Sequence, residues 1–323
     1  MKANLKCVKH DIPRCFHPAS SKEFSITLMR PVRGDLRPGL RLVAGLCLAA
    51  LLTGCGSIKV SRTVGLTGMT PLASPSQVKV VESGKAVSEP YQVVGKATVY
   101  RVNGGVSKGY STKRMKEIAA GMGADGLIGI REGFGSDPRA PTYFRSALAV
   151  KWLAPGEARR PVAAPFIVGM LPVGEDPEAP GNQAKITEAV SKAVVAPLEV
   201  KGYYVLPPGT LAYKGGIEGA RELKEAELQA LGGDDAHLLL EVAFVSRGQA
   251  HIIIGAGATA EMKATLMNKA TRTNVFEGTG AGQGYTGWLL NMTTPNAKRI
   301  AAATIGADYA LHGVKPIHEE LPK

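Results

Sequence analysis

The feature that most constrains this chain is an apolar run that begins at residue 40. Leu40–Leu52 contains thirteen residues and is interrupted only by Arg41 and Gly45. A helix of this length is too short to cross a bilayer, which needs about 20 apolar residues. A short apolar run behind basic residues, here Arg33 and Arg37, is typical of a secretory signal. We therefore expect the chain to be exported and its first part to be removed.

The run ends in Leu52-Thr53-Gly54-Cys55, which resembles the bacterial lipobox. The resemblance implies that the Cys55 thiol receives a lipid and that a peptidase cuts directly before it. The alternative is a buried apolar helix with an incidental cysteine, which leaves the basic flank unexplained. Gly56 follows the cysteine, so no Asp is present there to retain the protein in the inner membrane. We therefore predict a palmitate-bearing lipoprotein on the periplasmic face of the outer membrane.

The signal region, residues 1–54, is unusually long. Residues 1–28 show no clear apolar periodicity, whereas Met29 opens a basic stretch of ordinary length before the apolar run. We infer that Met29 is the true start; the alternative is that all 54 residues form the signal. The mature chain would then keep Cys55 as its one cysteine, so no disulfide is expected.

Charge and length limit the class of protein further. The formal net charge is +12, but nine Lys/Arg and only three Asp/Glu lie in residues 1–54, so the mature part is only mildly basic. This balance gives no reason to expect a nucleic-acid partner. The mature length is sufficient for two domains. We expect a lipidated tether over 55–76, a domain over 77–154, a Pro-rich linker over 155–163, a domain over 164–313 and a tail over 314–323.

The first domain is predicted to have the order ββαββ. A strand is expected over Gln92–Arg101, a helix over Thr112–Met122 with Ser111 as its N-cap, and strands over Gly126–Arg131 and Tyr143–Leu153, the last in the centre of the sheet. "MKEIAAGMGADGLIGI" followed by "YFRSALAVKW" resembles the RcsF/YbjQ-type fold. The RcsF sensor is braced by disulfides, and this domain has no cysteine.

The second domain is predicted to be a βαβαβββα sandwich. Strands are expected over Phe166–Leu171, Tyr203–Leu206, Ala236–Val245, Ile252–Ile254, Thr259–Met267 and Thr273–Thr279, with helices over Ala184–Val200, Ile217–Leu231 and Pro295–Leu311. "LEVKGYYVLP" and the later "GGDDAHLLLEV" resemble a family of neisserial surface lipoproteins with a fold like the amino-terminal domain of TolB. The family implies no enzyme activity and a role in envelope assembly or export. The fold class is thus α+β or α/β, with two small mixed domains.

The sequence contains no catalytic or metal-binding signature. The mature histidines, His237, His251, His312 and His318, lack the spacing of a zinc site. No nucleophile-elbow sequence is present. Ile254–Ala258 lacks the remainder of a dinucleotide fingerprint and is predicted to be a glycine-rich bend or bulge. We expect no cofactor, no metal and no enzyme activity.

Gly278–Trp288 contains five glycines and is predicted to be a flexible loop between a strand and a helix. Its Tyr285 and Trp288 are candidate partner contacts, because aromatic side chains often anchor interfaces. The alternative, and the commoner case, is that Trp288 folds onto the core.

These observations predict a non-enzymatic, lipid-anchored envelope protein that acts in envelope assembly or export through protein–protein contacts. Its expected partners are the membrane, reached through the lipid, and other envelope proteins, a secretion-type lipoprotein among them. The alternative is an envelope-stress sensing or regulatory lipoprotein that uses its first domain.

Overall fold

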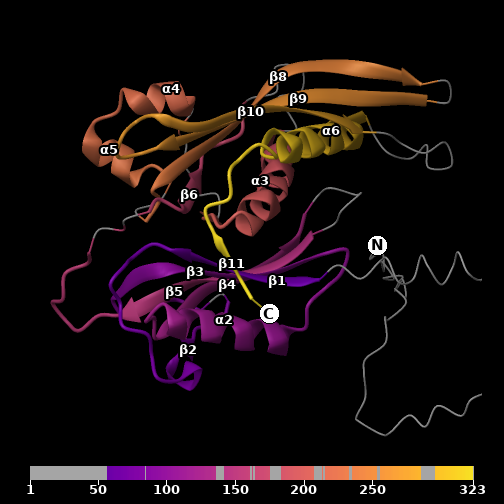
Figure 1. The fold of residues 1–323 in the computed structure, drawn as a ribbon. Coiled ribbons are helices and arrows are strands. Elements are labelled where there is room, and N and C mark those ends of the chain that lie inside the picture. Colours follow the sequence, from indigo (N-terminus) through magenta and orange to yellow (C-terminus); the bar gives the residue numbers. More distant parts are fainter. Residues whose placement is uncertain are drawn as a thin grey trace, which may run out of the picture. The chain divides into compact units, whose positions relative to one another are not determined.

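The computed structural model describes residues 57–83, 85–135, 142–160, 162, 164–174, 183–206, 213, 215–232, 235–252, 255–284 and 295–322. Over these residues the chain forms two mixed sheets and five α-helices, which confirms the predicted two-domain α+β class (Figure 1). None of the helices in these ranges is long and apolar enough to cross a membrane. Tyr285, Trp288 and the motif Leu52–Cys55 lie outside the described residues.

The first sheet has six strands in the order β11-β1-β3-β5-β4-β2. The strands are β1 (Ile58–Val64), β2 (Lys79–Val80), β3 (Tyr91–Val102), β4 (Gly126–Phe134), β5 (Thr142–Trp152) and β11 (Glu319–Leu321). Helix α2 (Lys108–Gly121) covers one face, where Met115, Ile118 and Ala119 are buried. The short 3-10 helix η1 (Pro75–Gln77) precedes β2. The central place of β5 was predicted correctly.

Two expected irregular segments are in fact strands of this sheet. The tether prediction is wrong for Ile58–Val64, which pairs antiparallel with β3 over its whole length. The tail prediction is wrong for Glu319–Leu321, which pairs with β1 on the side of β1 that faces away from β3. Segments this short carry too few residues for a clear alternation, and the β-branched content of β1 is the local feature that favours a strand.

The first turn of α2 also differs from the prediction. The helix begins at Lys108, with the Ser107 hydroxyl accepting a hydrogen bond from the Tyr110 N–H. The predicted N-cap, Ser111, is buried inside the helix instead. Its hydroxyl donates to carbonyls of the preceding turn and accepts from Arg145 of β5. Ser111 therefore binds the helix to the sheet rather than ending the helix.

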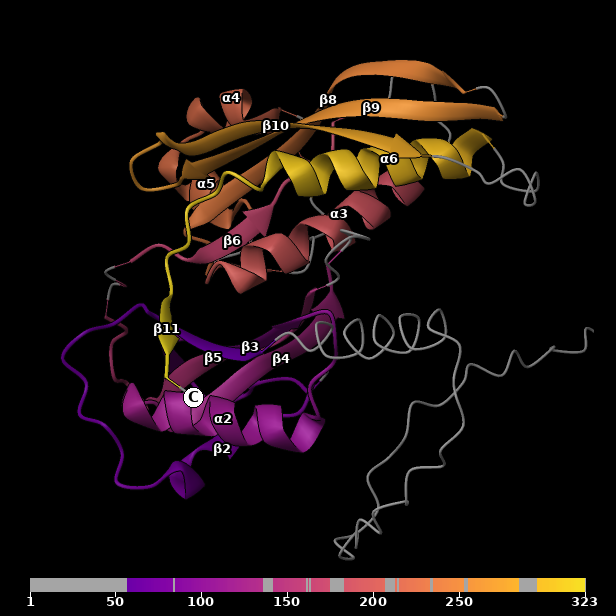
Figure 2. The same cartoon turned by 45° about the vertical axis from the view of Figure 1, so that its right-hand side comes forward.

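The second sheet has five strands in the order β10-β9-β8-β6-β7. They are β6 (Ile167–Met170), β7 (Tyr204–Val205), β8 (Leu238–Ile252), β9 (Gly255–Asn268) and β10 (Asn274–Gly284). Helices α3 (Gln183–Val200) and α6 (Pro295–Ala310) share one face, while α4 (Gly216–Arg221) and α5 (Glu225–Ala230) pack against the other (Figure 2). The sheet thus lies between two layers of helix.

The single helix predicted over Ile217–Leu231 is two short helices. Lys224 has an extended backbone between them, with φ −64° and ψ 155°. Arg272 stabilises the break, because its guanidinium donates to the Arg221 carbonyl at 2.7 Å and approaches the Glu225 carboxylate at 3.3 Å. The amphipathic pattern continues across the break, and for that reason the sequence alone suggests one helix.

Both glycine-rich predictions were wrong for the described residues. Residues 255–258 lie in β9 and pair regularly with β8, whose register shift falls instead between Phe244 and Ser246. Residues 278–284 are the second half of β10 rather than a flexible loop. A Cβ on Gly280 would lie 2.2 Å from the Ala310 nitrogen, and one on Gly282 would lie 2.0 Å from the Ala302 carbonyl oxygen. The alternate glycines therefore allow the backbone of α6 to rest directly on the strand.

Candidate functional site

The predicted lipidation site lies shortly before the first described strand in the sequence. Cys55 itself is outside the described residues, but β1 begins at Ile58, so only Gly56 and Ser57 separate the two. The partner-contact prediction for Tyr285 and Trp288 also falls outside the described residues and stays a prediction.

The histidines do not form a metal site in the described residues. His237 Nδ1 lies 3.4 Å from the backbone N–H groups of Phe166 and Ile167, and burial lowers the pKa of its imidazole. His312 and His318 lie near single carboxylates, Asp308 and Glu320, at 3.7 Å and 4.0 Å. Over the described ranges, no three His, Cys, Asp or Glu side chains gather in a way that could hold an ion.

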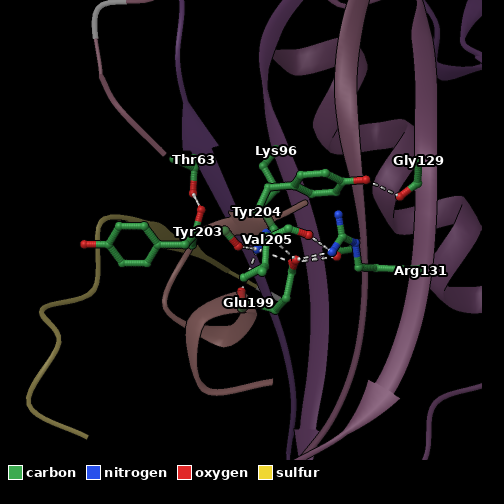
Figure 3. Close-up of polar contacts among 10 residues, drawn as sticks. Thr63, Lys96, Gly129, Arg131, Glu199, Tyr203, Tyr204 and Val205 are labelled. Atoms are coloured by element: carbon green, nitrogen blue, oxygen red, sulfur yellow. Dashed lines mark hydrogen bonds and ion pairs between the residues drawn. The ribbon is translucent and has the colours of Figure 1, made fainter. Parts of the chain in front are cut away.

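A fully buried ion pair joins Lys96 of β3 and Glu199 of α3. Both side chains have 0% exposure, and Lys96 Nζ lies 2.7 Å from Glu199 Oε2 (Figure 3). The same ammonium donates to the backbone carbonyls of Glu199 at 2.7 Å and Tyr203 at 2.5 Å. All three of its N–H groups are therefore used, which is the condition for tolerating a buried charge.

The Glu199 carboxylate is equally well bonded. Oε2 also accepts from the Ser146 hydroxyl of β5 at 2.7 Å, and Oε1 accepts from the Val205 N–H at 3.1 Å. Arg131 of β4 lies 3.4 Å from Oε1 and donates to the Val205 carbonyl. Groups from β3, β4 and β5 of the first sheet thus converge on the end of α3 and on β7 of the second domain.

A bulge in β4 places Arg131 in this network. The register of β4 against β5 shifts between Ile128 and Arg131, and Gly129 has φ +60°. The Arg131 guanidinium stacks on the Tyr204 ring at 3.6 Å, and the Tyr204 hydroxyl donates to the Gly129 carbonyl at 2.8 Å (Figure 3). A Cβ on Gly129 would lie 2.2 Å from that hydroxyl. The glycine therefore serves both the bulge and the close approach of Tyr204.

Burial governs the electrostatics of the pair. Desolvation lowers the pKa of Lys96 from 10.5 to about 8, with Glu199 opposing the shift and Arg131 adding to it. Lys96 and Glu199 are fully enclosed and bond to groups of both sheets, so this network connects the two domains. We call Lys96, Arg131, Ser146, Glu199 and Tyr204 the junction network.

The two edge strands β1 and β11 add further connections to the second domain. Thr63 of β1 donates to the Gly202 carbonyl at 2.8 Å. The Tyr100 hydroxyl donates to Glu320 of β11 at 2.6 Å, and burial together with this carboxylate raises the pKa of Tyr100. Lys59 lies 3.0 Å from the same carboxylate. The chain thus passes from the second domain back to the edge of the first sheet.

Sequence reasoning missed the junction network. One feature of the sequence does point to the network. Lys96 stands in the middle of an apolar, β-branched strand, "VVGKATVY", and a lysine there needs either a buried partner or a solvent-exposed side chain. The partner Glu199 stands in the last turn of α3, where the helix dipole disfavours a carboxylate. An unfavourable helix position is a usable sign that the side chain has a tertiary role.

Two of the hollows in the surface of the described residues contain charged side chains that bear on function. One of about 350 Å³ is lined by Tyr91, Gln92, Arg159, Asp235 and His237 among others. Its charges bond to each other, since Arg159 lies 3.2 Å from Asp235 and the Tyr91 hydroxyl donates to the same carboxylate at 3.3 Å. The other, of about 700 Å³, runs along α2 and η1 and is lined by three lysines, Lys108, Lys113 and Lys116.

Comparison with known proteins gives limited similarity. No protein-family model and no curated protein matches the chain. Among solved structures, lipoprotein GNA1162 from Neisseria meningitidis is 18% identical, with a TM-score of 0.27, covering 40% of this chain and 92% of its own. The hypothetical protein CT253 from Chlamydia trachomatis is 11% identical, with a TM-score of 0.31 and coverages of 47% and 94%. PelC from Paraburkholderia phytofirmans, a dodecamer, is 14% identical, with a TM-score of 0.28 and coverages of 47% and 86%.

Each similarity covers less than half of this chain, and none identifies a function. The RcsF/YbjQ-type resemblance of the first domain stays a prediction.

Proposed function

We propose that this chain is a non-enzymatic lipoprotein, anchored through Cys55 to the outer membrane, that acts in envelope assembly or export through protein–protein contacts. The observation that carries the proposal is the motif Leu52–Cys55 directly behind a basic flank and a thirteen-residue apolar run. The position of the first described strand supports it: this strand begins at Ile58, so processing before Cys55 would remove none of the described strands.

The long β8–β9 hairpin supports a role in protein contacts. β8 pairs with β9 from Leu238 to Ile252, but it pairs with β6 only from Leu238 to Leu240. Within the described ranges, the outer part of β8 therefore has a strand neighbour on one side only. Val245, at the register shift of this strand, is 53% exposed. Strand edges of this kind pair with segments of other proteins.

The anchor is tested by mass spectrometry and fractionation. Cys55→Ser should abolish lipidation and release the processed or unprocessed chain from the outer-membrane fraction. Cys47→Ser is the matched control, because it changes another cysteine of the signal region and leaves the motif intact. A Cys55→Ser protein that still sediments with the outer membrane would refute the anchor.

The contact role is tested by photocrosslinking in intact cells. A photoreactive residue at Val245 should give discrete crosslinked products, whereas one at Val275, which is similarly exposed on β10, should give none of these. Identical product patterns at the two positions would contradict a contact surface on the hairpin.

A further inference from the structure

One end of the first sheet lies at Ile58, the first residue of β1 and the sheet residue nearest in sequence to the proposed anchor Cys55. The register places Ile58 of β1 opposite Arg101 of β3, Arg101 opposite Tyr143 of β5, and Tyr143 opposite Phe134 of β4. These four residues form one row across four strands. At about 4.8 Å per strand, Phe134 lies about 14 Å from Ile58 along the row. We call this row the anchor-side end of the sheet.

Exposed aromatic side chains gather at this end. Phe134 is 64% exposed, although its ring contacts that of Tyr143 with centroids 5.2 Å apart. Tyr110, in the first turn of α2, is 41% exposed. The helix belongs to the same end, because the Lys108 carbonyl accepts a hydrogen bond from Arg145, two residues along β5 from Tyr143. Exposed Phe and Tyr side chains are typical of surfaces that enter the headgroup region of a bilayer.

Basic side chains extend from the same end along α2. Lys108, Lys113 and Lys116 line the hollow of about 700 Å³, together with one acid, Glu117, which is paired with Arg114. Lysines that flank exposed aromatic residues complement the negative phosphates of anionic lipids. The opposite face of the sheet is not available for such a contact, because Tyr100 and Phe144 pack there against α3.

The length of chain between anchor and sheet fixes how far this end can stand from a bilayer. Ile58 follows Cys55 by three positions along the chain, and a fully extended chain spans at most about 3.6 Å per position. Ile58 therefore lies within about 11 Å of Cys55. If the cysteine carries acyl chains, a gap of this size leaves no room for another protein domain between the bilayer and this end.

We propose that the anchor-side end of the first sheet and the adjoining first turn of α2 rest on the lipid surface. Phe134 and Tyr110 enter the headgroup region, and the lysines of α2 face anionic lipid phosphates. This inference rests on the proposed anchor at Cys55. The contact would orient the body so that the β8–β9 hairpin is presented in one fixed direction.

The test uses the mature lipoprotein, whose one cysteine is consumed by lipidation, so that an introduced cysteine is the sole thiol. Phe134→Cys, labelled with an environment-sensitive fluorophore, is reconstituted in vesicles of phosphatidylethanolamine and phosphatidylglycerol that contain a nitroxide lipid. The control is Val275→Cys, 51% exposed on β10 of the second sheet. Quenching at position 134 should exceed that at position 275 by about twofold or more, as expected for a side chain within the headgroup layer. Equal quenching at both positions would overturn the proposal.

Two further measurements separate the causes of failure. An intact-mass measurement shows whether Cys55 carries lipid. If Cys55 carries no lipid, the proposed anchor is wrong, but the proposal that this end of the sheet faces lipid can still be tested. In that case the Cys55 thiol is coupled to a maleimide lipid in the same vesicles, and hydrogen exchange is measured in residues 107–114 and 130–135. Protection that disappears in the Phe134→Ser/Tyr110→Ser variant supports the lipid-facing end, whereas unchanged exchange on vesicles overturns it.

Discussion

The junction network makes a sharp prediction about stability. Replacing Lys96 by Met keeps a side chain of similar length and removes the ammonium. Glu199 then loses its closest cation while remaining fully buried, with Arg131 at 3.4 Å and the hydrogen bonds from Ser146 and Val205 still present. The backbone carbonyls of Glu199 and Tyr203 also lose the hydrogen bond from this ammonium. Breaking a buried pair in this way costs about 3–5 kcal/mol of unfolding free energy.

The assay is urea unfolding of the secreted, unlipidated chain at neutral pH. The matched control is Lys192→Met, which removes a lysine that lies 2.6 Å from Glu188 but has a side chain 74% exposed. An exposed pair of this kind contributes little to stability, because water and salt screen it. The comparison therefore varies burial while keeping the pair chemistry and the distance nearly constant.

A double-mutant cycle identifies the pair itself. Glu199→Gln should also destabilise, and the combination Lys96→Met/Glu199→Gln should cost less than the sum of the two single changes by at least about 1 kcal/mol. The reasoning is refuted if Lys96→Met costs no more than Lys192→Met, or if the two junction changes add without coupling.

Three further outcomes follow from single contacts. Because the unfolded chain holds the Lys96 proton up to pH 10.5 and the folded protein releases it at about 8, the unfolded state binds more protons between these values. Urea titrations should therefore show that the Lys96 contribution to stability rises from pH 8 to 9.5 and is absent in Lys96→Met. Gly280→Ala should cost about 1–3 kcal/mol by thermal unfolding, because its Cβ would meet the Ala310 nitrogen at 2.2 Å. Gly121→Ala should instead stabilise by about 0.5–1 kcal/mol, because nothing lies within 4 Å of the new methyl group at the end of α2; a loss of stability there would contradict the stated space.

The elements that sequence reasoning predicted well are the long ones. The strands β3 and β5 and the helices α3 and α6 were placed within a few residues, because each is a continuous stretch of more than ten residues and the sequence signal is summed over that length. The segments β1 and β11 were missed for a physical reason. Their stability comes from pairing with each other and with β3, and the partners in β1 and β11 stand about 260 residues apart in the chain. No local pattern encodes such a contact.

The junction network was beyond prediction for a related reason. A buried lysine signals that a partner exists, but that partner is fixed by the packing of α3 on the first sheet, and Arg131 joins the network only through a one-residue bulge at Gly129. The register of a strand determines which side chains share a face, and a bulge changes that assignment locally. The sequence therefore indicates an unusual residue at Lys96 without indicating Glu199 as its counterpart.

The glycines of β10 present a different case, because their signal was present in the sequence and was assigned to the wrong element. Residues 278–284 read Gly-Thr-Gly-Ala-Gly-Gln-Gly, with a glycine at every second position. A flexible loop has no reason to keep a period of two, whereas a strand has two faces with that period. The glycine face lies under α6, whose contacting residues are themselves small, among them Ala302, Gly306 and Ala310. Since backbone meets backbone here, no side chain can move aside to admit a Cβ, and the packing of α6 depends on the glycine pattern itself.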